Sequence, residues 1–237
     1  MTTAPLKGKE RQENVWLPAP AAPGDPVELD KVRAIYDREA EPVGSVPPPS
    51  GIMGVVKTGP RMGLGGNPTV FIDKLGERLA FERTGSRLFE LLITKLQSGA
   101  SPAGPVDVEV LRRFREQEMR HFHSLWECLE NLGADPTVQT PSADLAGVKG
   151  LGLIQIMSDP RASFAQSLDA MLIAEHADND GWRLLIALAE GLGQKDMSET
   201  FRAALLEEDV HLATIRDWWA RLNLEEAGVE KELDNLP

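Results

Sequence analysis

The stretch "LLEEDVHLATIRDWWARL", from Leu205 to Leu222, decides how the chain folds. Its apolar residues recur at every third or fourth position, which is typical of an amphipathic helix. Glu208 stands in the middle of this apolar stripe, and His211 follows three positions later on the same face. A charged group within an apolar stripe is costly unless a partner compensates for it. The stretch therefore predicts a helix whose glutamate and histidine meet partners in the interior.

Three further segments repeat this pattern of a long apolar stripe that contains one glutamate. Periodicity predicts helices from Asn67-Pro68 to the stretch "SGASPAGP", and over about 106–132, 163–192 and 197–222. A connection of roughly thirty residues, long for a helical domain, joins the second helix to the third. Within it, we expect the stretch "SADLAGVKGLGLIQIM" to form a short helix. Such a connection can cross the fold from end to end and leave those two helices parallel. The sequence thus predicts an all-α fold, a four-helix bundle with a long crossover between its second and third helices.

The residues before this bundle differ in composition. Eleven of the 17 prolines lie before residue 69, and proline and glycine interrupt regular elements. We therefore expect an irregular, Pro/Gly-rich extension over residues 1–66, with one short helix over about 27–39. The bundle would span residues 67–223, and an acidic tail would follow over 224–237.

Charge and composition exclude several classes of protein. A net charge of −12 and a pI near 4.9 argue against a nucleic-acid-binding surface, which would have to attract phosphates. The single cysteine, Cys128, excludes an intrachain disulfide and any cysteine-only metal site, and it fits a reducing compartment. No apolar run reaches the roughly 18 residues of a membrane span, and the N-terminus lacks the apolar core of a signal peptide. These features predict a cytoplasmic protein that binds neither nucleic acid nor membranes.

Each of the four predicted helices carries one glutamate on its apolar stripe, and two of these glutamates have a histidine three residues later. The six residues are Glu82, Glu118, His121, Glu175, Glu208 and His211. Four buried carboxylates would repel one another, and two divalent cations would balance their charge. Oxygen ligands with imidazole suit iron or manganese, and the lack of thiolates disfavours structural zinc. The alternative, that these glutamates are surface charges, requires the helix phase to be misjudged four times.

This pattern resembles the ferritin-like di-iron and di-manganese carboxylate proteins, in which two helices carry Glu and two carry Glu-x-x-His. The order of the ligands and the place of the long connection are similar to bacterioferritin and rubrerythrin over residues 68–222. The resemblance implies a ferritin-like four-helix bundle that binds two iron or manganese ions through the six residues named above. It also implies that Glu118 and Glu208 bridge the ions and that Glu82 and Glu175 are terminal ligands. No catalytic or cofactor-binding residue beyond these ligands is predicted.

Three more residues are candidates for the surroundings of the metal ligands. Gln117 and Glu207 directly precede two ligand glutamates, and metal-bound imidazoles usually donate their second N–H to an oxygen. Across the bundle, Glu207 could hold His121 and Gln117 could hold His211, with exposure to solvent as the alternative. Asp178 occupies a position where rubrerythrin-like proteins can carry an additional carboxylate, although we expect it at the surface.

The resemblance implies a di-iron oxidoreductase that oxidises Fe(II) with O₂ or peroxide, as a ferroxidase does. Two alternatives stay open: iron storage in an oligomeric cage, and a non-catalytic interaction role, because "AEHADNDGWRLLIALAEGLG" is similar to ferritin-like stress proteins of bacteria. No CxxC pair is present for a rubredoxin-like module, and the only tyrosine, Tyr36, lies outside the bundle. We expect a homodimer or another small homo-oligomer, since the extension over 1–66 is awkward in a closed cage.

Overall fold

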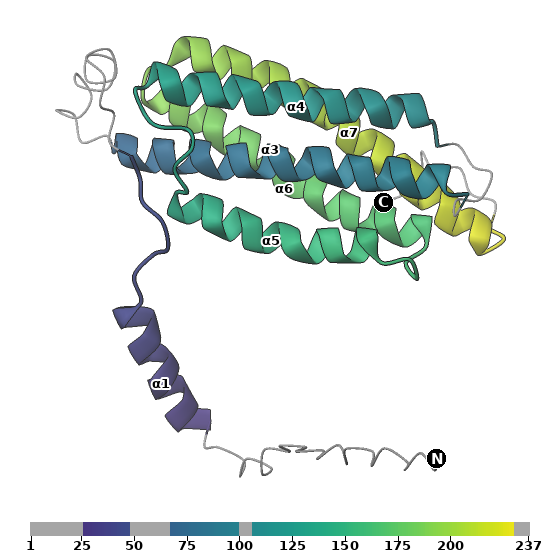
Figure 1. Cartoon of the computed structure of the whole chain (residues 1–237), viewed down its shortest axis with the longest axis horizontal. Coiled ribbons are helices and arrows are strands. Elements are labelled where there is room, and N and C mark those ends of the chain that lie inside the picture. The colour runs from purple at the N-terminus through teal and green to yellow at the C-terminus, as the bar shows by residue number, and fades with distance from the viewer. Residues whose placement is uncertain (1–25, 48–66, 100–105, 230–237) are drawn as a thin grey trace, which may run out of the picture. The chain divides into compact units, whose positions relative to one another are not determined.

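The computed structural model describes residues 26–47, 67–99 and 106–229. All regular elements in these ranges are helices, which confirms the all-α prediction (Figure 1). They are α1 (Pro26–Glu39), α3 (Pro68–Gln97), α4 (Val108–Asn131), α5 (Pro141–Ser158), α6 (Phe164–Gly191) and α7 (Lys195–Glu226). The chain divides into two units, one that contains α1 and one that starts at Pro42 and contains the other five helices. No helix among the described residues combines the length and the apolar character that crossing a membrane requires.

Local signals set the ends of the long helices. Asn67 caps α3 by accepting a hydrogen bond from the backbone N–H of Thr69, and a reciprocal capping box of Ser163 and Gln166 starts α6. The sequence placed the end of the last helix too early. The helix α7 continues to Glu226 and stops where Gly228 adopts a φ of 64°, because glycine accepts the left-handed conformation that commonly follows a helix. The first residues of the expected acidic tail are therefore helical.

The four long helices of the second unit enclose two apolar clusters, one toward each end. The first cluster includes Phe71, Leu75, Leu125, Trp182 and Phe201. The second cluster includes Phe89, Phe114, Leu168, Ile215 and Trp218. The helices α3, α4, α6 and α7 each contribute to both clusters, and α3 packs against α4 and α6 while α7 packs against α4 and α6. The residues between the two clusters form a separate middle layer of the interior.

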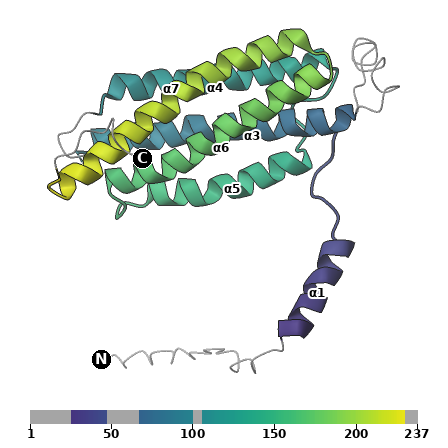
Figure 2. The same ribbon diagram turned by 180° about the vertical axis from the view of Figure 1, so that it is seen from behind.

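The order of the clusters along the chain gives the direction of each helix. The chain passes from the first cluster to the second in α3 and α7, and from the second to the first in α4 and α6. The helices α4 and α6 are therefore parallel, as the long connection between them led us to expect. Figure 2 shows α6 and α7 side by side, with α5 next to α6.

The helix α5 returns the chain along α3 and makes this parallel arrangement possible. At its start, the backbone N–H of Ser142 donates to Asp73 Oδ1 at 2.9 Å, near the beginning of α3. At its end, Lys95 Nζ, near the end of α3, donates to the carbonyl oxygen of Asp159 at 3.0 Å. The crossover is thus an ordered helix that is fixed to α3 at both ends.

Candidate metal centre

The middle layer between the two apolar clusters holds all six residues that the sequence proposed as metal ligands. They come from α3 (Glu82), α4 (Glu118, His121), α6 (Glu175) and α7 (Glu208, His211). None is more than 5% exposed. The apolar stripes predicted from periodicity were therefore in phase on all four helices.

The imidazole of His121 lies between carboxylates on both of its sides. Its Nδ1 is 2.7 Å from Glu208 Oε1 and 3.5 Å from Glu82 Oε2. Its Nε2 lies 2.9 Å from Glu207 Oε2, and Glu207 also contacts Arg120 at 3.2 Å. Because a carboxylate only accepts, Nε2 carries the proton of this hydrogen bond. The ring of His121 is thus held from outside and turns Nδ1 toward the buried carboxylates.

His211 repeats this arrangement on the opposite helix. Its Nδ1 is 3.0 Å from Glu208 Oε2, 3.4 Å from Glu118 Oε1 and 3.9 Å from Glu175 Oε2. Its Nε2 lies 3.0 Å from the amide oxygen of Gln117. Both hydrogen bonds that the sequence suggested around the histidines are therefore present. The two other histidines of the chain, His123 and His176, are exposed.

Three overlapping sets of side chains bring ligand atoms within 4.8 Å of one another. They are Glu118, Glu175, Glu208 and His211; Glu82, His121 and Glu208; and Glu82, Glu118, Asp178 and Glu208. Each of the first two sets contains one histidine, and Glu208 belongs to all three. The cluster could therefore hold a metal ion near each histidine, with Glu208 between the two positions.

Many buried polar atoms of this layer have no hydrogen-bond partner among the residues that the structure describes. They include both carboxylate oxygens of Glu82 and of Glu208, one oxygen each of Glu118 and Glu175, and Nδ1 of both histidines. Some lie within 3 Å of each other, as given above, but without the alignment of a hydrogen bond. A buried polar atom without a partner costs about 1–3 kcal/mol, and native proteins contain few. Oxygen and imidazole nitrogen atoms that converge in this way fit a cation that accepts their lone pairs.

A buried arginine belongs to the same layer, and sequence analysis missed it. Arg78 of α3 is 4% exposed; its Nε lies 3.0 Å from Glu82 Oε1 and its Nη1 lies 2.8 Å from Asp178 Oδ1. Nη1 also donates to the backbone carbonyl of Asp178 at 3.1 Å. The sequence did contain one indication of this contact: Arg78 and Glu82 are four residues apart, which places both side chains on one face of the helix.

The prediction that Asp178 lies at the surface is wrong. Asp178 is 2% exposed because it shares the inward face of α6 with Glu175, three residues earlier. The guanidinium of Arg78, 2.8 Å away, offsets part of the cost of burying this carboxyl group. The layer therefore holds five buried carboxyl groups and one guanidinium.

Burial makes it unfavourable to ionise several of these groups. It raises the pKa of Glu118, Glu175 and Asp178 well above the ordinary range, and the nearby carboxylate of Glu208 raises each of them further. Arg78 opposes this rise at Asp178. Without a cation, like charges at close range in a desolvated interior favour proton uptake.

Glu208 and His121 behave as an ion pair instead. Burial opposes the ionised form of Glu208, but the imidazoles of His211 and His121 hold the pKa of this carboxyl at about 2. Burial likewise opposes the charged form of His121, but the carboxylates of Glu208 and Glu82 close to its Nδ1 raise the pKa of its imidazole to about 10. A metal ion that binds Nδ1 would displace this proton and take over its role.

A glycine on α3 makes room for one of the carboxylates. A Cβ at Gly85 would lie 2.1 Å from Glu118 Oε2, closer than atoms can approach. The carboxylate of Glu118 therefore occupies the space that any other residue at position 85 would fill.

Replacing Gly85 with alanine is expected to weaken metal binding by about 10- to 100-fold, the range seen when residues that orient metal ligands are lost. The methyl group would force Glu118 away from the other carboxylates. Gly152→Ala in α5 is the matched control, because a Cβ there meets nothing within 4 Å. Anaerobic titration of both variants with Fe(II) measures the affinity, and equal affinities would contradict the role of Gly85.

Comparison with known proteins adds no indication of what this site does. The chain matches no protein-family model, no curated protein and no solved structure. Any function must therefore follow from the residues and the geometry of the site itself.

Proposed function

We propose that the chain is a ferritin-like di-metal carboxylate protein that oxidises Fe(II) with O₂ or peroxide. The observation that carries this proposal is the matched pair of imidazoles. His121 and His211 each turn Nδ1 toward carboxylates that include Glu208, and each has Nε2 held by an oxygen from the facing helix. An Nε2–H that donates outward fixes the tautomer whose Nδ1 carries a lone pair for a metal. Two equivalent halves that share one carboxylate support two adjacent ions rather than one.

The charges of the layer support the same number of ions. Its five carboxyl groups carry five negative charges when ionised, and Arg78 stays positively charged under all ordinary conditions. Two divalent cations would supply the four positive charges that are still needed. A single divalent ion would leave two buried negative charges without compensation, which a desolvated interior does not tolerate.

In this proposal Fe(II) is the substrate, and the side chains hold two ions next to each other. Glu82 and His121 would hold one ion and Glu175 and His211 the other, with Glu118 and Glu208 between them; oxygen and imidazole ligands suit iron and manganese. Each Fe(II) gives up one electron. Two electrons and two protons convert O₂ to H₂O₂, and the same number converts H₂O₂ to two molecules of water.

Aromatic side chains hold both imidazoles in place and keep water from the site. The ring of His211 lies against Phe114, with centroids 4.1 Å apart, and against Phe89 at 5.5 Å. The ring of His121 lies 5.5 Å from that of Trp182, which is fully buried. Rings fixed in this way present Nδ1 at a constant position and limit the access of other ligands.

The proposal predicts that the protein takes up two Fe(II) ions per chain and then consumes O₂ or peroxide. Fe(III) absorption in the near ultraviolet should rise well above the rate of Fe(II) in buffer alone. His121→Ala should abolish this fast phase, because the variant loses a ligand. His123→Ala is the matched control, since His123 lies two residues away on the same helix but is exposed.

Metal analysis of the protein, together with stopped-flow absorbance under defined O₂, measures both quantities. A stoichiometry near zero would overturn the proposal, as would an oxidation rate equal to the buffer blank. Equal oxidation rates in His121→Ala and His123→Ala would show that His121 takes no part in the reaction. This result would also contradict the proposal.

A further inference from the structure

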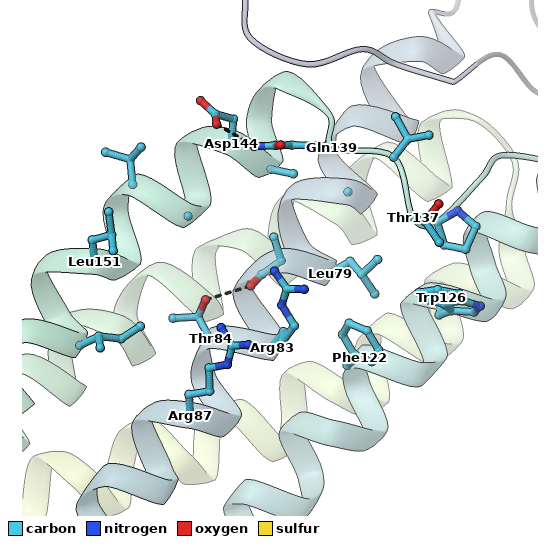
Figure 3. A pocket seen from close by; sticks show the side chains of 18 residues that line it. Leu79, Arg83, Thr84, Arg87, Phe122, Trp126, Thr137, Gln139, Asp144 and Leu151 are labelled. Atoms are coloured by element: carbon cyan, nitrogen blue, oxygen red, sulfur yellow. Dashed lines mark hydrogen bonds between the residues drawn. The ribbon is translucent and has the colours of Figure 1, made fainter. Parts of the chain in front are cut away.

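A second candidate site lies beside α3, separate from the candidate metal centre. A pocket of about 700 Å³ opens between α3, α4 and α5, a size within the usual range for small-molecule sites. None of the six proposed metal ligands lines it. Figure 3 shows α3 between Phe122 and Trp126 of α4 on one side and Leu151 of α5 on the other.

Large apolar side chains form two walls of this pocket, one on α4 and one on α5. Phe122 and Trp126 are half-buried, and on α5 the side chains of Val148 and Leu151 are 60% and 57% exposed. Apolar side chains exposed side by side in one hollow are unfavourable in water and often mark a binding surface. Gly147 of α5 also lines the pocket, and a Cβ at this position would meet no atom within 4 Å. The space next to Gly147 is therefore open.

Two arginines whose guanidinium groups have no partner in the described part of the chain also line the pocket. Arg83 and Arg87 lie one turn apart on α3 and are both exposed (Figure 3). Among the described residues, every other arginine contacts a carboxylate, an aromatic ring or a histidine, whereas these two guanidinium groups contact none. Like charges at this helical spacing repel each other. In a protein with a net charge of −12, two uncompensated arginines beside an apolar wall fit an anion that has an apolar part.

Among the described residues, a single acidic side chain lines the pocket, and it lies away from Arg87. Asp144, in the first turn of α5, accepts a hydrogen bond from Gln139 Nε2 at 2.7 Å. Figure 3 places this pair at the opposite end of the pocket from Arg87. The lining runs along α3 from Gly76 to Arg87, which is about 16 Å at the helical rise of about 1.5 Å per residue. The pocket is thus elongated, with its positive charge toward one end.

We propose that this pocket binds an amphiphilic organic anion, an extended apolar chain with a single carboxylate or phosphate head group. The guanidinium groups of Arg83 and Arg87 hold the head group through charge-assisted hydrogen bonds. The chain lies against Phe122, Trp126 and Leu151. This binding is a function in addition to Fe(II) oxidation, and it needs no metal. The two proposals can therefore be tested independently of each other.

Calorimetric titration of the full-length, metal-free protein with decanoate and with decyl phosphate tests the proposal, and the tighter ligand identifies the head group. We expect saturable binding with one ligand per chain, and much weaker binding of decyltrimethylammonium. The double variant Arg83→Gln/Arg87→Gln should lose at least about tenfold in affinity for the anion, because two charge-assisted contacts disappear. Its affinity for 1-decanol should not change.

Two further variants make the result specific to this pocket. Arg112→Gln/Arg202→Gln changes the net charge equally, but these arginines lie outside the pocket, so its affinity should equal that of the wild type. Gly147→Leu places a side chain in the open space and should weaken the binding of both the anion and the alcohol. The proposal is overturned if neither anion binds saturably, or if both double variants bind the anion equally.

Discussion

Replacing Glu208 with glutamine is expected to weaken metal binding by roughly 100-fold or more, since the loss of residues that merely orient ligands already costs about 10- to 100-fold. Glu208 belongs to every set of converging ligand atoms. One of its oxygens lies 2.7 Å from His121 Nδ1, and the other lies 3.0 Å from His211 Nδ1. Glutamine keeps the size of the side chain but removes the charge and one acceptor atom. Both halves of the site would lose a ligand at once.

Anaerobic titration with Fe(II), followed by metal analysis after gel filtration, measures this loss. Glu199→Gln is the matched control, because Glu199 is an exposed glutamate on the same helix. Circular dichroism at each step shows whether the variant is folded. If the Glu208→Gln variant still bound two ions tightly, the carboxylate of Glu208 would have no role in metal binding.

Arg78→Met is expected to lower the free energy of unfolding of the metal-free protein by about 3–5 kcal/mol, the usual cost of removing one partner of a buried ion pair. Arg78 is the only permanent positive charge in contact with the buried carboxyl groups of Glu82 and Asp178 among the described residues. Methionine fills much of the volume but leaves Asp178 without a cation, and Glu82 keeps only the imidazole of His121 at 3.5 Å. Because burial raises the pKa of Asp178 and Arg78 opposes this rise, the carboxyl group of Asp178 would then take up a proton or draw in water.

Urea denaturation with and without metal measures this effect. Arg202→Met removes an exposed ion pair with Glu190, and exposed pairs contribute only about 0–1 kcal/mol. Addition of a divalent metal should restore part of the stability of Arg78→Met, because an ion that binds only the folded state stabilises it. Equal losses in the two variants would show that Arg78 does not hold the buried carboxylates.

Local sequence patterns determined where the helices lie and predicted that glutamate and histidine side chains are buried in the interior. The spacing of three or four between apolar residues is a property of a single helix, so the stripe around Glu208 and His211 could be recognised without a partner. Helix ends followed from signals such as Asn67 and Ser163. The length of the connection before α6 indicated that α4 and α6 run parallel, because a short turn can join only antiparallel neighbours.

The hydrogen bonds to the two histidines could also be predicted from local sequence patterns. Gln117 and Glu207 each directly precede a glutamate of the interior, so the position of one residue on a helix restricts where its neighbour can point. The need of a metal-bound imidazole for an outer acceptor then suggested the pairing across helices. The contacts of 2.9 and 3.0 Å agree with it.

The tertiary structure alone decided how the charges of the interior balance one another. Asp178 is buried because Arg78, which lies 100 residues earlier in the chain, compensates it, and no local pattern reports on a partner at that separation. The same holds for Gly85, whose missing side chain matters only because Glu118 of another helix lies against it. A helix face follows from the spacing of residues within one segment, whereas the electrostatic balance of a buried site follows from atoms that only packing brings together.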